Sequence, residues 1–580
     1  MNVAAEKIST IDAPSNQQAT PFESATSKLD SAIHTMGAVM GLSPIALSLA
    51  WLDWGMHLAS SPGRQMELGV AALKKAQSFV AELPEKIPPQ ENSIDGAKFV
   101  LGQWDRVMQA WREWGADACK VQGVSPHHMQ MNQFFMGQIF ELMASKNWPA
   151  TNPDIWQATL ESGGRNLWQG EQNWLRDRRR IHSPEDPTPY RPGHEVAITP
   201  GQVVYRNHLI ELICYTPQTA TVHPEPLLIV PSWIMKYYIL DLSPHNSMVK
   251  YLVQQGHQVF ILSWNNPDAA DRDLGMEDYL QLGVFDALAA IKEICGEVAV
   301  HSAGYCLGGT LLAIAASALA RPEKVSKAKR LPSLASVTLL AAQTDFAEPG
   351  EMGVLIDDSQ VNMIEDLMAQ TGYMTGAQMA GSFQFLNSRD LVWNKRLREY
   401  WLGVRDAGTD MMAWNADVTR LPARMHGEYL HQFFLENALA EGKYLVEGKP
   451  VSLQDIRQPM FVVGTARDQV SPWRSVYKIL RLARTDICFL LASGGHNAGI
   501  VSEPGHAKRS YQMHHHHLQD ASISADSWPQ QMATQEGSWW PAWQQWLAAR
   551  SSPQAKVKPL AAKYQLQAAP GSYVLKKFDE

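Results

Sequence analysis

The chain has 580 residues, which is enough for two or three domains and a large buried core. Its formal net charge of −8 argues against a strong basic field of the kind that binds nucleic acid. The cysteines are widely scattered without a CxxC pair, which predicts neither a zinc site nor a disulfide framework and fits a reducing cytoplasm. We expect no secretory signal in the polar N-terminus and no transmembrane segment, because no apolar run is long enough.

The first part of the chain predicts a helical domain behind a polar terminus. Residues 1–30 are rich in Ser, Thr, Gln and Ala, which indicates a disordered N-terminus. Apolar residues then recur at spacings of three and four, for example over 102–111 and 133–140. We therefore predict a helical N-terminal domain over residues 31–185, ending near a proline-rich linker at 183–189.

Short apolar runs follow, separated mostly by stretches with helical patterning. In chain order they are 203–205, 209–213, 227–230, 259–262, 298–300, 337–340, 460–463 and 487–490. The first two predict a hairpin, and the others predict buried parallel strands joined by crossover helices. Because the interval of about 345–455 is long, helical in pattern and rich in Met, Trp and Tyr, we predict a cap inserted there. The fold class is therefore α/β, with an α/β-hydrolase-like catalytic domain over residues 186–580 that a helix near 537–547 closes.

The run Gly304-Tyr305-Cys306-Leu307-Gly308 joins one of these strands to a helix rich in small residues. A Gly-x-nucleophile-x-Gly run in that setting is typical of a nucleophile elbow, where the backbone turns sharply and presents one side chain above the sheet. The nucleophile here would be the thiol of Cys306. A thiolate attacks thioesters well and can hold an acyl group as another thioester, so the run indicates acyl transfer. The alternative is a small buried cysteine with no chemical role.

The partners of such a nucleophile follow it in the order acid, then histidine. Asp468 comes just after the run 460–463, and His496 comes after 487–490 within Gly494-Gly495-His496. We predict that His496 takes the thiol proton and that Asp468 orients the imidazole. Asp468 could instead cap a turn, and His496 could be a loop histidine. The alternative acid is Asp345, and the alternative histidines are His506 and His301.

An oxyanion hole would need backbone N–H donors from two places. One donor is predicted to be Leu307, directly after the nucleophile. The other should come from the loop 231–234, and because Pro231 has no N–H, Trp233 or Ile234 is the candidate. The alternative is that the loop 231–234 is a simple strand-to-helix turn without a role in catalysis. The run His514–His517 is predicted to be an exposed loop without a catalytic role, and no metal site is expected.

These residues resemble the polyhydroxyalkanoate synthase family, with a class I-like form of the elbow. The resemblance runs from about residue 100 to the C-terminus. It rests on Gly304-Tyr305-Cys306-Leu307-Gly308-Gly309-Thr310, on the runs 230–242 and 263–268, on Asp345-Phe346 with 349–351, on Trp414-Asn415-Ala416-Asp417, and on Gly495-His496 with Ala498-Gly499. Ser232 and Met235 stand where the family often has proline and asparagine, which leaves the geometry of the oxyanion loop open.

The resemblance implies a polymerase that takes (R)-3-hydroxyacyl-CoA, releases CoA and lengthens a polyester held as a Cys306 thioester. It also implies that Asp468 orients His496 and, in some proposals for the family, helps to activate the 3-hydroxyl of the incoming unit. A homodimer on cytoplasmic polyester granules, working without metal or organic cofactor, is implied as well. The alternatives are a thioesterase or polyester depolymerase with the same Cys-His-Asp triad, and a granule-surface scaffold without activity.

Overall fold

The computed structural model describes residues 43–82, 93–181, 190–379, 381, 393–405, 408–521 and 523–577. The expected disordered N-terminus (1–30) and the expected linker (183–189) lie outside the described residues. Among the helices within those ranges, none combines the length and the apolar character that crossing a bilayer requires.

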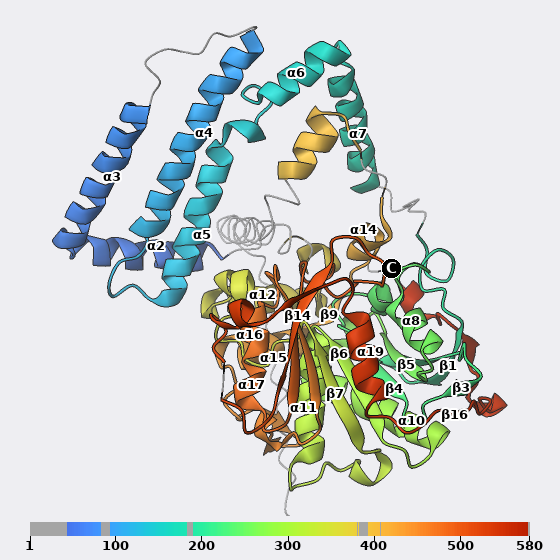
Figure 1. Cartoon of the computed structure of the whole chain (residues 1–580). Helices are drawn as coiled ribbons and strands as arrows, with labels where there is room; N and C mark the ends of the chain where they lie inside the picture. Colours follow the sequence, from blue (N-terminus) through green and yellow to red (C-terminus); the bar gives the residue numbers. More distant parts are fainter. Residues whose placement is uncertain are drawn as a thin grey trace, which may run out of the picture.

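A sheet of 11 strands forms the centre of the molecule (Figure 1), in the order β15-β14-β13-β12-β7-β6-β4-β5-β2-β1-β17. Strands β5, β4, β6, β7, β12 and β13 run parallel, and the strands on both flanks are antiparallel. The bounds are β1 (Gly201–Arg206), β2 (Ile210–Tyr215), β4 (Leu227–Val230), β5 (Val259–Trp264), β6 (Val300–Tyr305), β7 (Leu334–Leu340), β12 (Met460–Thr465), β13 (Ile487–Ala492), β14 (Ser510–His516), β15 (Thr534–Glu536) and β17 (Gln567–Ala568).

Helices cover both faces of this sheet, which explains why the central strands read as continuous apolar runs. In β12, Met460 and Val462 join the core on one face, while Phe461 and Val463 join the core on the other. The first core contains α10 (Asp286–Cys295) and α11 (Leu307–Ala320). The second contains α8 (Met248–Gln254) and α19 (Trp540–Ala548), the predicted closing helix. The predicted α/β fold class is confirmed by this architecture and by the family match reported below.

Each predicted strand overlaps a strand of the sheet, although the run 298–300 shares only Val300 with β6 (Val300–Tyr305), and the outer strands were not expected. The expectation that His514–His517 form an exposed loop is wrong for most of the run, because His514, His515 and His516 belong to β14. This strand pairs antiparallel with β13, placing His516 beside Ile487 and His514 beside Phe489. The pairing covers the open edge of β13 and buries His516 against the Tyr477 ring.

The segment between β7 and β12 is mainly helical, and we refer to residues 345–455 as the cap. Its described elements are η6 (Gly350–Leu355), α12 (Asp358–Thr371), β8 (Tyr373–Met374), the π-helix η8 (Arg396–Trp401), α14 (Asp410–Asn415), β9 (Leu421–Pro422), α15 (Ala423–Tyr429), the π-helix η9 (Leu430–Leu435), β10 (Leu445–Val446), β11 (Lys449–Pro450) and η10 (Leu453–Asp455). The cap contacts the loop after β4, where Val418 forms an isolated antiparallel β-bridge with Met235.

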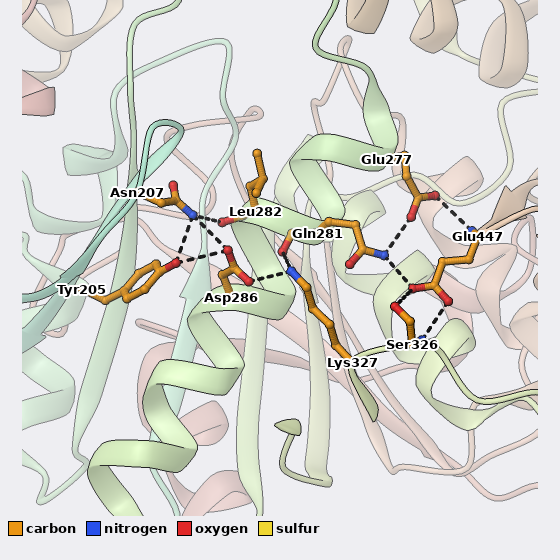
Figure 2. A network of polar contacts seen from close by, with 9 residues as sticks. All are labelled: Tyr205, Asn207, Glu277, Gln281, Leu282, Asp286, Ser326, Lys327 and Glu447. Atoms are coloured by element: carbon orange, nitrogen blue, oxygen red, sulfur yellow. Dashed lines mark hydrogen bonds and ion pairs between the residues drawn. The ribbon is translucent and has the colours of Figure 1, made fainter. Parts of the chain in front are cut away.

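The C-terminal end of the cap is anchored to the core by a polar network (Figure 2). Glu447 accepts hydrogen bonds from the backbone N–H of Ser326 at 2.8 Å and from the Gln281 amide at 3.1 Å. Next to them, Lys327 donates to the Asp286 carboxylate at 2.7 Å and to the Gln281 carbonyl at 3.1 Å. Gln281 lies in the π-helix η4 (Tyr279–Phe285), which follows α9 (Met276–Asp278) and leads into α10. The hairpin of β10 and β11 near the end of the cap is thus linked by hydrogen bonds to Ser326 and to Gln281 of η4.

The N-terminal region is helical, as predicted, and stands apart from the sheet in Figure 1. Its elements are α2 (Pro44–Ala59), α3 (Pro62–Glu82), α4 (Ser93–Ala118), α5 (Pro126–Met143), η1 (Ser145–Asn147), α6 (Pro153–Ser162) and α7 (Arg165–Ile181). The helices reach the rest of the chain through the cap. Ala46 and Met131 share a small buried cluster with Val354 and Leu355, and Asp177 pairs with Arg405 at 2.6 Å.

Short elements complete the described part of the chain. They are β3 (Thr221–Val222), η2 (Tyr237–Asp241), η3 (Ala269–Asp271), η5 (Ala328–Arg330), α16 (Trp473–Tyr477), α17 (Ile479–Leu482), α18 (Trp528–Gln531), β16 (Ala555–Lys556), η11 (Ala562–Tyr564) and η12 (Tyr573–Leu575). Beyond α19 the chain returns along the sheet, and residues 566–577 form what we call the C-terminal strap. Its strand β17 pairs with β1, and Glu211 accepts hydrogen bonds from the backbone N–H groups of Ser572 and Tyr573.

The strap ends beside the loop that follows β4. Lys236 of that loop is 3% exposed and donates to the carbonyl oxygens of Lys576 at 2.8 Å and Tyr573 at 3.4 Å. Burial lowers the pKa of this ammonium group to about 8, although the nearby Asp417 carboxylate opposes the shift. The strap therefore supports this loop by accepting the hydrogen bonds of Lys236.

Candidate active site

Cys306 lies at the sharp turn between β6 and α11. Its backbone has φ 53° and ψ −126°, a conformation that non-glycine residues rarely adopt. The backbone N–H of Cys306 donates to the Leu340 carbonyl at 2.9 Å, and its carbonyl accepts from the Gly309 N–H at 2.9 Å. The side chain is half-buried and contacts the cores on both faces of the sheet. The turn has the form of the predicted elbow, with the sulfur above the carboxyl end of β6.

The glycines of the elbow allow helix α11 to start directly against the strands. A Cβ on Gly304 would lie 2.4 Å from Gly309 Cα, and a Cβ on Gly308 would lie 2.1 Å from the Val230 carbonyl oxygen. Such distances leave room only for glycine. The elbow sequence is therefore fixed by the close approach of α11 to β4 and β6, and that approach places Cys306 beside the loop after β4.

His496 and Asp468 come together from loops that follow neighbouring strands. Asp468 follows β12, His496 follows β13, and His496 Nδ1 lies 2.8 Å from Asp468 Oδ2. The Asp468 carboxylate is fully buried and also accepts hydrogen bonds from the Thr465 hydroxyl at 2.8 Å and from the N–H groups of Val470 at 2.9 Å and Ser471 at 2.8 Å. Four donors thus hold one carboxylate in place, and that carboxylate fixes one edge of the imidazole.

The other side of the imidazole faces the Cys306 sulfur. Burial by itself would lower the pKa of His496, but the charges of Cys306 and Asp468, together with hydrogen bonds to both side chains, raise it to about 10. A raised imidazole pKa means that the protonated ring is stabilised between the sulfur and the carboxylate. The structure therefore brings together all three side chains predicted from the sequence.

The loop after β4 lies where the second oxyanion donor was expected. Trp233 is 2% exposed and packs against Trp264 and Tyr279, with ring centroids 6.1 Å and 5.2 Å away. The Ile234 N–H donates to the Ser232 hydroxyl at 3.3 Å. Among the hydrogen bonds of the described residues, the backbone N–H groups of Leu307 and Trp233 have no acceptor within the protein. Of the two candidates in this loop, Trp233 is therefore the one whose N–H is available.

Residues 418–419 of the cap hold this loop. The Thr419 hydroxyl donates to the Trp233 carbonyl, and the Thr419 N–H donates to the Ile234 carbonyl at 3.0 Å. The Trp414 indole N–H donates to the Lys236 carbonyl at 2.7 Å. The shape of the loop thus depends on the cap.

The alternative acid and histidines lie in other surroundings. Asp345 accepts hydrogen bonds from the Ala347 N–H at 2.8 Å and from the Asn437 amide at 3.2 Å. His301 is buried within β6, between the hydroxyls of Ser336 and Ser551. His506 lies in the connection between β13 and β14, where its N–H donates to the Glu503 carbonyl.

Sequence reasoning missed three residues around the imidazole and the sulfur. The Tyr305 ring packs on His496 with centroids 5.5 Å apart, and the Tyr305 hydroxyl donates to Asn497 Oδ1 at 2.6 Å. Tyr429 of the cap is close enough for the Cys306 charge to add to burial in raising the tyrosine's pKa. Tyr305 and Asn497 are sequence neighbours of Cys306 and His496, and this adjacency could have identified them. Tyr429 is distant in sequence from all three predicted residues, so nothing in the sequence indicated it. Within the ranges that the structure describes, no three His, Cys, Asp or Glu side chains gather in a way that could hold a metal ion.

Comparison of the sequence with known proteins shows the family to which the chain belongs. The family model "Poly-beta-hydroxybutyrate polymerase (PhaC) N-terminus" matches residues 100–252, and "Poly-beta-hydroxybutyrate polymerase N terminal" matches residues 24–64. An alpha/beta hydrolase fold model matches residues 225–503. The chain is 34% identical to the poly(3-hydroxyalkanoate) polymerase of Methylorubrum extorquens over 524 residues, which is 88% of this chain and 85% of the relative. The chain belongs to the poly(3-hydroxyalkanoate) polymerase family.

Two further relatives agree with this assignment. The poly(3-hydroxyalkanoate) polymerase subunit PhaC of Cupriavidus necator is 36% identical over 77% of this chain and 76% of its own length. That of Rhizobium etli is 33% identical over 85% of this chain and 78% of its own length. The predicted resemblance and the prediction of an acyltransferase-type polymerase are thus confirmed.

Proposed function

We propose that this enzyme polymerises (R)-3-hydroxyacyl units from CoA thioesters into polyester and releases CoA, through an acyl group held on Cys306. The observation that carries the proposal is the meeting of three side chains. Cys306 stands at a strained elbow, and a half-buried His496, held at 2.8 Å by Asp468, has its pKa raised by the sulfur and the carboxylate. A protonated imidazole beside a cysteine sulfur favours the thiolate, which is the nucleophilic form.

In the first half-reaction the Cys306 thiolate attacks the carbonyl carbon of the acyl-CoA thioester. The tetrahedral oxyanion would be stabilised by the Leu307 N–H and the Trp233 N–H, the two donors without an internal acceptor among the described residues. The intermediate collapses by breaking the carbon–sulfur bond to CoA, and the imidazolium of His496 gives its proton to the departing sulfur. CoA leaves as a thiol, and the acyl group stays on Cys306.

In chain growth the 3-hydroxyl of the next acyl-CoA attacks the carbonyl of the Cys306 thioester. His496 takes the hydroxyl proton, the new ester bond forms, and the proton passes to the Cys306 sulfur as the carbon–sulfur bond breaks. The lengthened chain then returns to Cys306 by a repeat of the first half-reaction. The four hydrogen bonds to Asp468 and its complete burial support an orienting role for this residue, with His496 as the base for the hydroxyl.

The test uses purified full-length protein with (R)-3-hydroxybutyryl-CoA. We expect CoA release together with insoluble polyester, and radiolabelled monomer covalently bound to the peptide that contains Cys306. Cys306→Ala should abolish both the label and CoA release. CoA release with free hydroxy acid and no polymer would instead support a thioesterase or depolymerase, and release that survives Cys306→Ala would refute the role of this sulfur.

We further propose a homodimer that acts at the surface of cytoplasmic polyester granules, as the family resemblance implies. Exposed apolar side chains on the N-terminal helices support a contact with an apolar partner, for example Ile45, Leu49, Leu52 and Met56 along α2. In this proposal residues 31–185 form the N-terminal domain and residues 186–580 the catalytic domain, with the cap at about 345–455 gating entry. Sedimentation with and without nascent polymer would test both the dimer and the granule association.

A further inference from the structure

Tyr305 lies directly before the nucleophile and beneath the imidazole. It is 2% exposed, and its ring is tilted by 33° to the His496 ring at a centroid distance of 5.5 Å. Burial, together with the charges of Cys306 and Asp468, raises the pKa of the Tyr305 hydroxyl well above its ordinary value. The hydroxyl therefore stays protonated and acts as a hydrogen-bond donor throughout the working pH range.

The acceptor of that hydrogen bond is the residue next to the catalytic histidine. Tyr305 donates to Asn497 Oδ1 at 2.6 Å, a short distance for this kind of bond. The backbone carbonyl of Asn497, a different acceptor, takes hydrogen bonds from the N–H groups of Ile500 at 3.1 Å and Val501 at 2.9 Å. The loop that carries His496 is therefore fixed at Asn497, both to the turn that follows it and to the end of β6.

A third residue joins this pair to the cap. Asn497 Nδ2 donates to Asn415 Oδ1 at 3.4 Å, and Asn415 is the last residue of α14. Three and four positions further along the cap, Val418 and Thr419 contact the loop that carries Trp233. One short stretch of the cap thus contacts both the histidine loop and the loop expected to stabilise the oxyanion.

We propose that Tyr305 and Asn497 are positioning residues that hold His496 over the Cys306 sulfur, and that Asn415 couples this arrangement to the cap. The proposal rests on the proposed function, because it assigns His496 as the base for Cys306. Neither Tyr305 nor Asn497 transfers a proton. Their effect is to keep the imidazole in line with the sulfur, and the contact between Asn415 and Asn497 reinforces that alignment.

The experiment measures how fast iodoacetamide alkylates Cys306 in the full-length protein between pH 5 and 10, by mass spectrometry of the Cys306 peptide. This readout needs no substrate and separates Cys306 from the four other cysteines. Tyr305→Phe removes the donor and keeps the ring, and Asn497→Ala removes the acceptor. Each should slow alkylation at neutral pH about fivefold and shift its pH profile, and each should lower kcat similarly with little change in KM. The double variant should be no slower than the slower single variant, because both remove one interaction.

The matched control is Tyr477→Phe, which removes a buried hydroxyl whose hydrogen bond, to the Ile523 carbonyl at 3.0 Å, lies away from the site. This variant should leave the alkylation profile unchanged. Asn415→Ala should slow alkylation about twofold in the native background and not at all in Asn497→Ala, which already lacks the amide that donates to Asn415. Should Tyr305→Phe fail to fold, Asn497→Ala carries the same test, because Asn497 is only half-buried.

An unchanged alkylation profile in Asn497→Ala or Tyr305→Phe would overturn the positioning role, even if thermal stability falls. Equal effects of Asn415→Ala in both backgrounds, or no effect, would overturn the coupling to the cap. These outcomes are separate from failure of the proposed function. If Cys306→Ala still released CoA, the acyl-cysteine route would be refuted, yet the alkylation rates would still report how Tyr305 and Asn497 position the imidazole.

Discussion

Asp468→Asn is the change that most directly probes the arrangement around the imidazole. The substitution keeps the shape and can still accept the N–H groups of Val470 and Ser471, but it removes the charge beside His496 Nδ1. The amide can donate to Nδ1, which would leave the ring proton on the nitrogen that faces Cys306. An imidazole in that tautomer cannot take the thiol proton.

The size of the effect can be worked from the pKa of His496. Its rise from 6.5 to about 10 corresponds to roughly 5 kcal/mol of preference for the protonated ring, since one pKa unit is about 1.4 kcal/mol. Because burial opposes this rise, the sulfur and the carboxylate together contribute more than the net value; if they contribute equally, loss of the carboxylate costs at least about 2–3 kcal/mol, or roughly a hundredfold in the reactive ion pair. The tautomer change adds to this, so we expect kcat to fall by about 10²–10⁴.

The assay is CoA release from (R)-3-hydroxybutyryl-CoA, followed by loss of thioester absorbance. The control is Asp345→Asn, the same chemical change at the alternative acid, which bonds Ala347 and Asn437 instead of His496. We expect less than a threefold loss there. Retention of more than a tenth of the native kcat in Asp468→Asn, or an equal loss in Asp345→Asn, would refute the assignment of the acid.

The same pKa predicts how stability depends on pH. Because the folded pKa of His496 is raised, its stabilisation is complete below the ordinary value of 6.5 and is lost as the pH rises through about 10. In Asp468→Asn the pKa of His496 loses the carboxylate's contribution, so the variant has less of this stabilisation at low pH and its loss is complete at a lower pH. Urea denaturation from pH 6 to 10 should therefore show a steeper decline for the native chain than for the variant, and parallel curves would contradict this reasoning.

Three further predictions concern packing, the strap and acid stability. Gly308→Ala places a Cβ 2.1 Å from the Val230 carbonyl oxygen, so thermal unfolding should show at least about 1–3 kcal/mol of destabilisation together with loss of activity. The control Gly69→Ala, with no atom within 4 Å, should stabilise helix α3 by about 0.5–1 kcal/mol. Lys236→Met leaves two strap carbonyls without their donor and should cost about 1–3 kcal/mol in denaturant unfolding and reduce CoA release; unchanged stability would exclude a supporting role. Four buried histidines have lowered pKa values, about 3 in one and about 4 in the others, so their stabilisation is present above pH 6.5 and is lost as the pH falls. At pH 5 each should cost up to about 2 kcal/mol relative to pH 7, and equal urea midpoints at the two pH values would contradict this. The four histidines of this last prediction are His257, His301, His426 and His516.

The central strands could be predicted from the sequence because both faces of the sheet are buried. Runs such as 460–463 and 487–490 are continuously apolar, and the polar turns that follow them carry Asp468 and His496. The carboxyl ends of parallel strands meet at one edge of a sheet, so the order of the residues along the chain was enough to bring Cys306 and His496 together. The glycines flanking Cys306 supplied the remaining signal.

What the sequence did not reveal depends on contacts between distant segments or on strands without an apolar pattern. Strand β14 has polar residues on both faces and ends in three histidines, so its pairing with β13 left no periodic signal. Strand β17 has two residues and is defined only by its partner β1. The hydrogen bond from the Thr419 hydroxyl to the Trp233 carbonyl joins residues that are 186 positions apart in the sequence. Such contacts are set by how the cap and the strap pack, which local composition does not encode.

The strap also determines when, during synthesis of the polypeptide, the loop after β4 gains its contacts. Gln202 pairs with Ala568, and Lys236 donates to the carbonyl oxygens of Tyr573 and Lys576. During synthesis the N-terminal segments emerge first, so the sheet can form while its last partner is still inside the ribosome. The loop is supported by these contacts only after residues 566–577 have left the ribosome, so folding of the strap completes the surroundings of Lys236 after the sheet has formed.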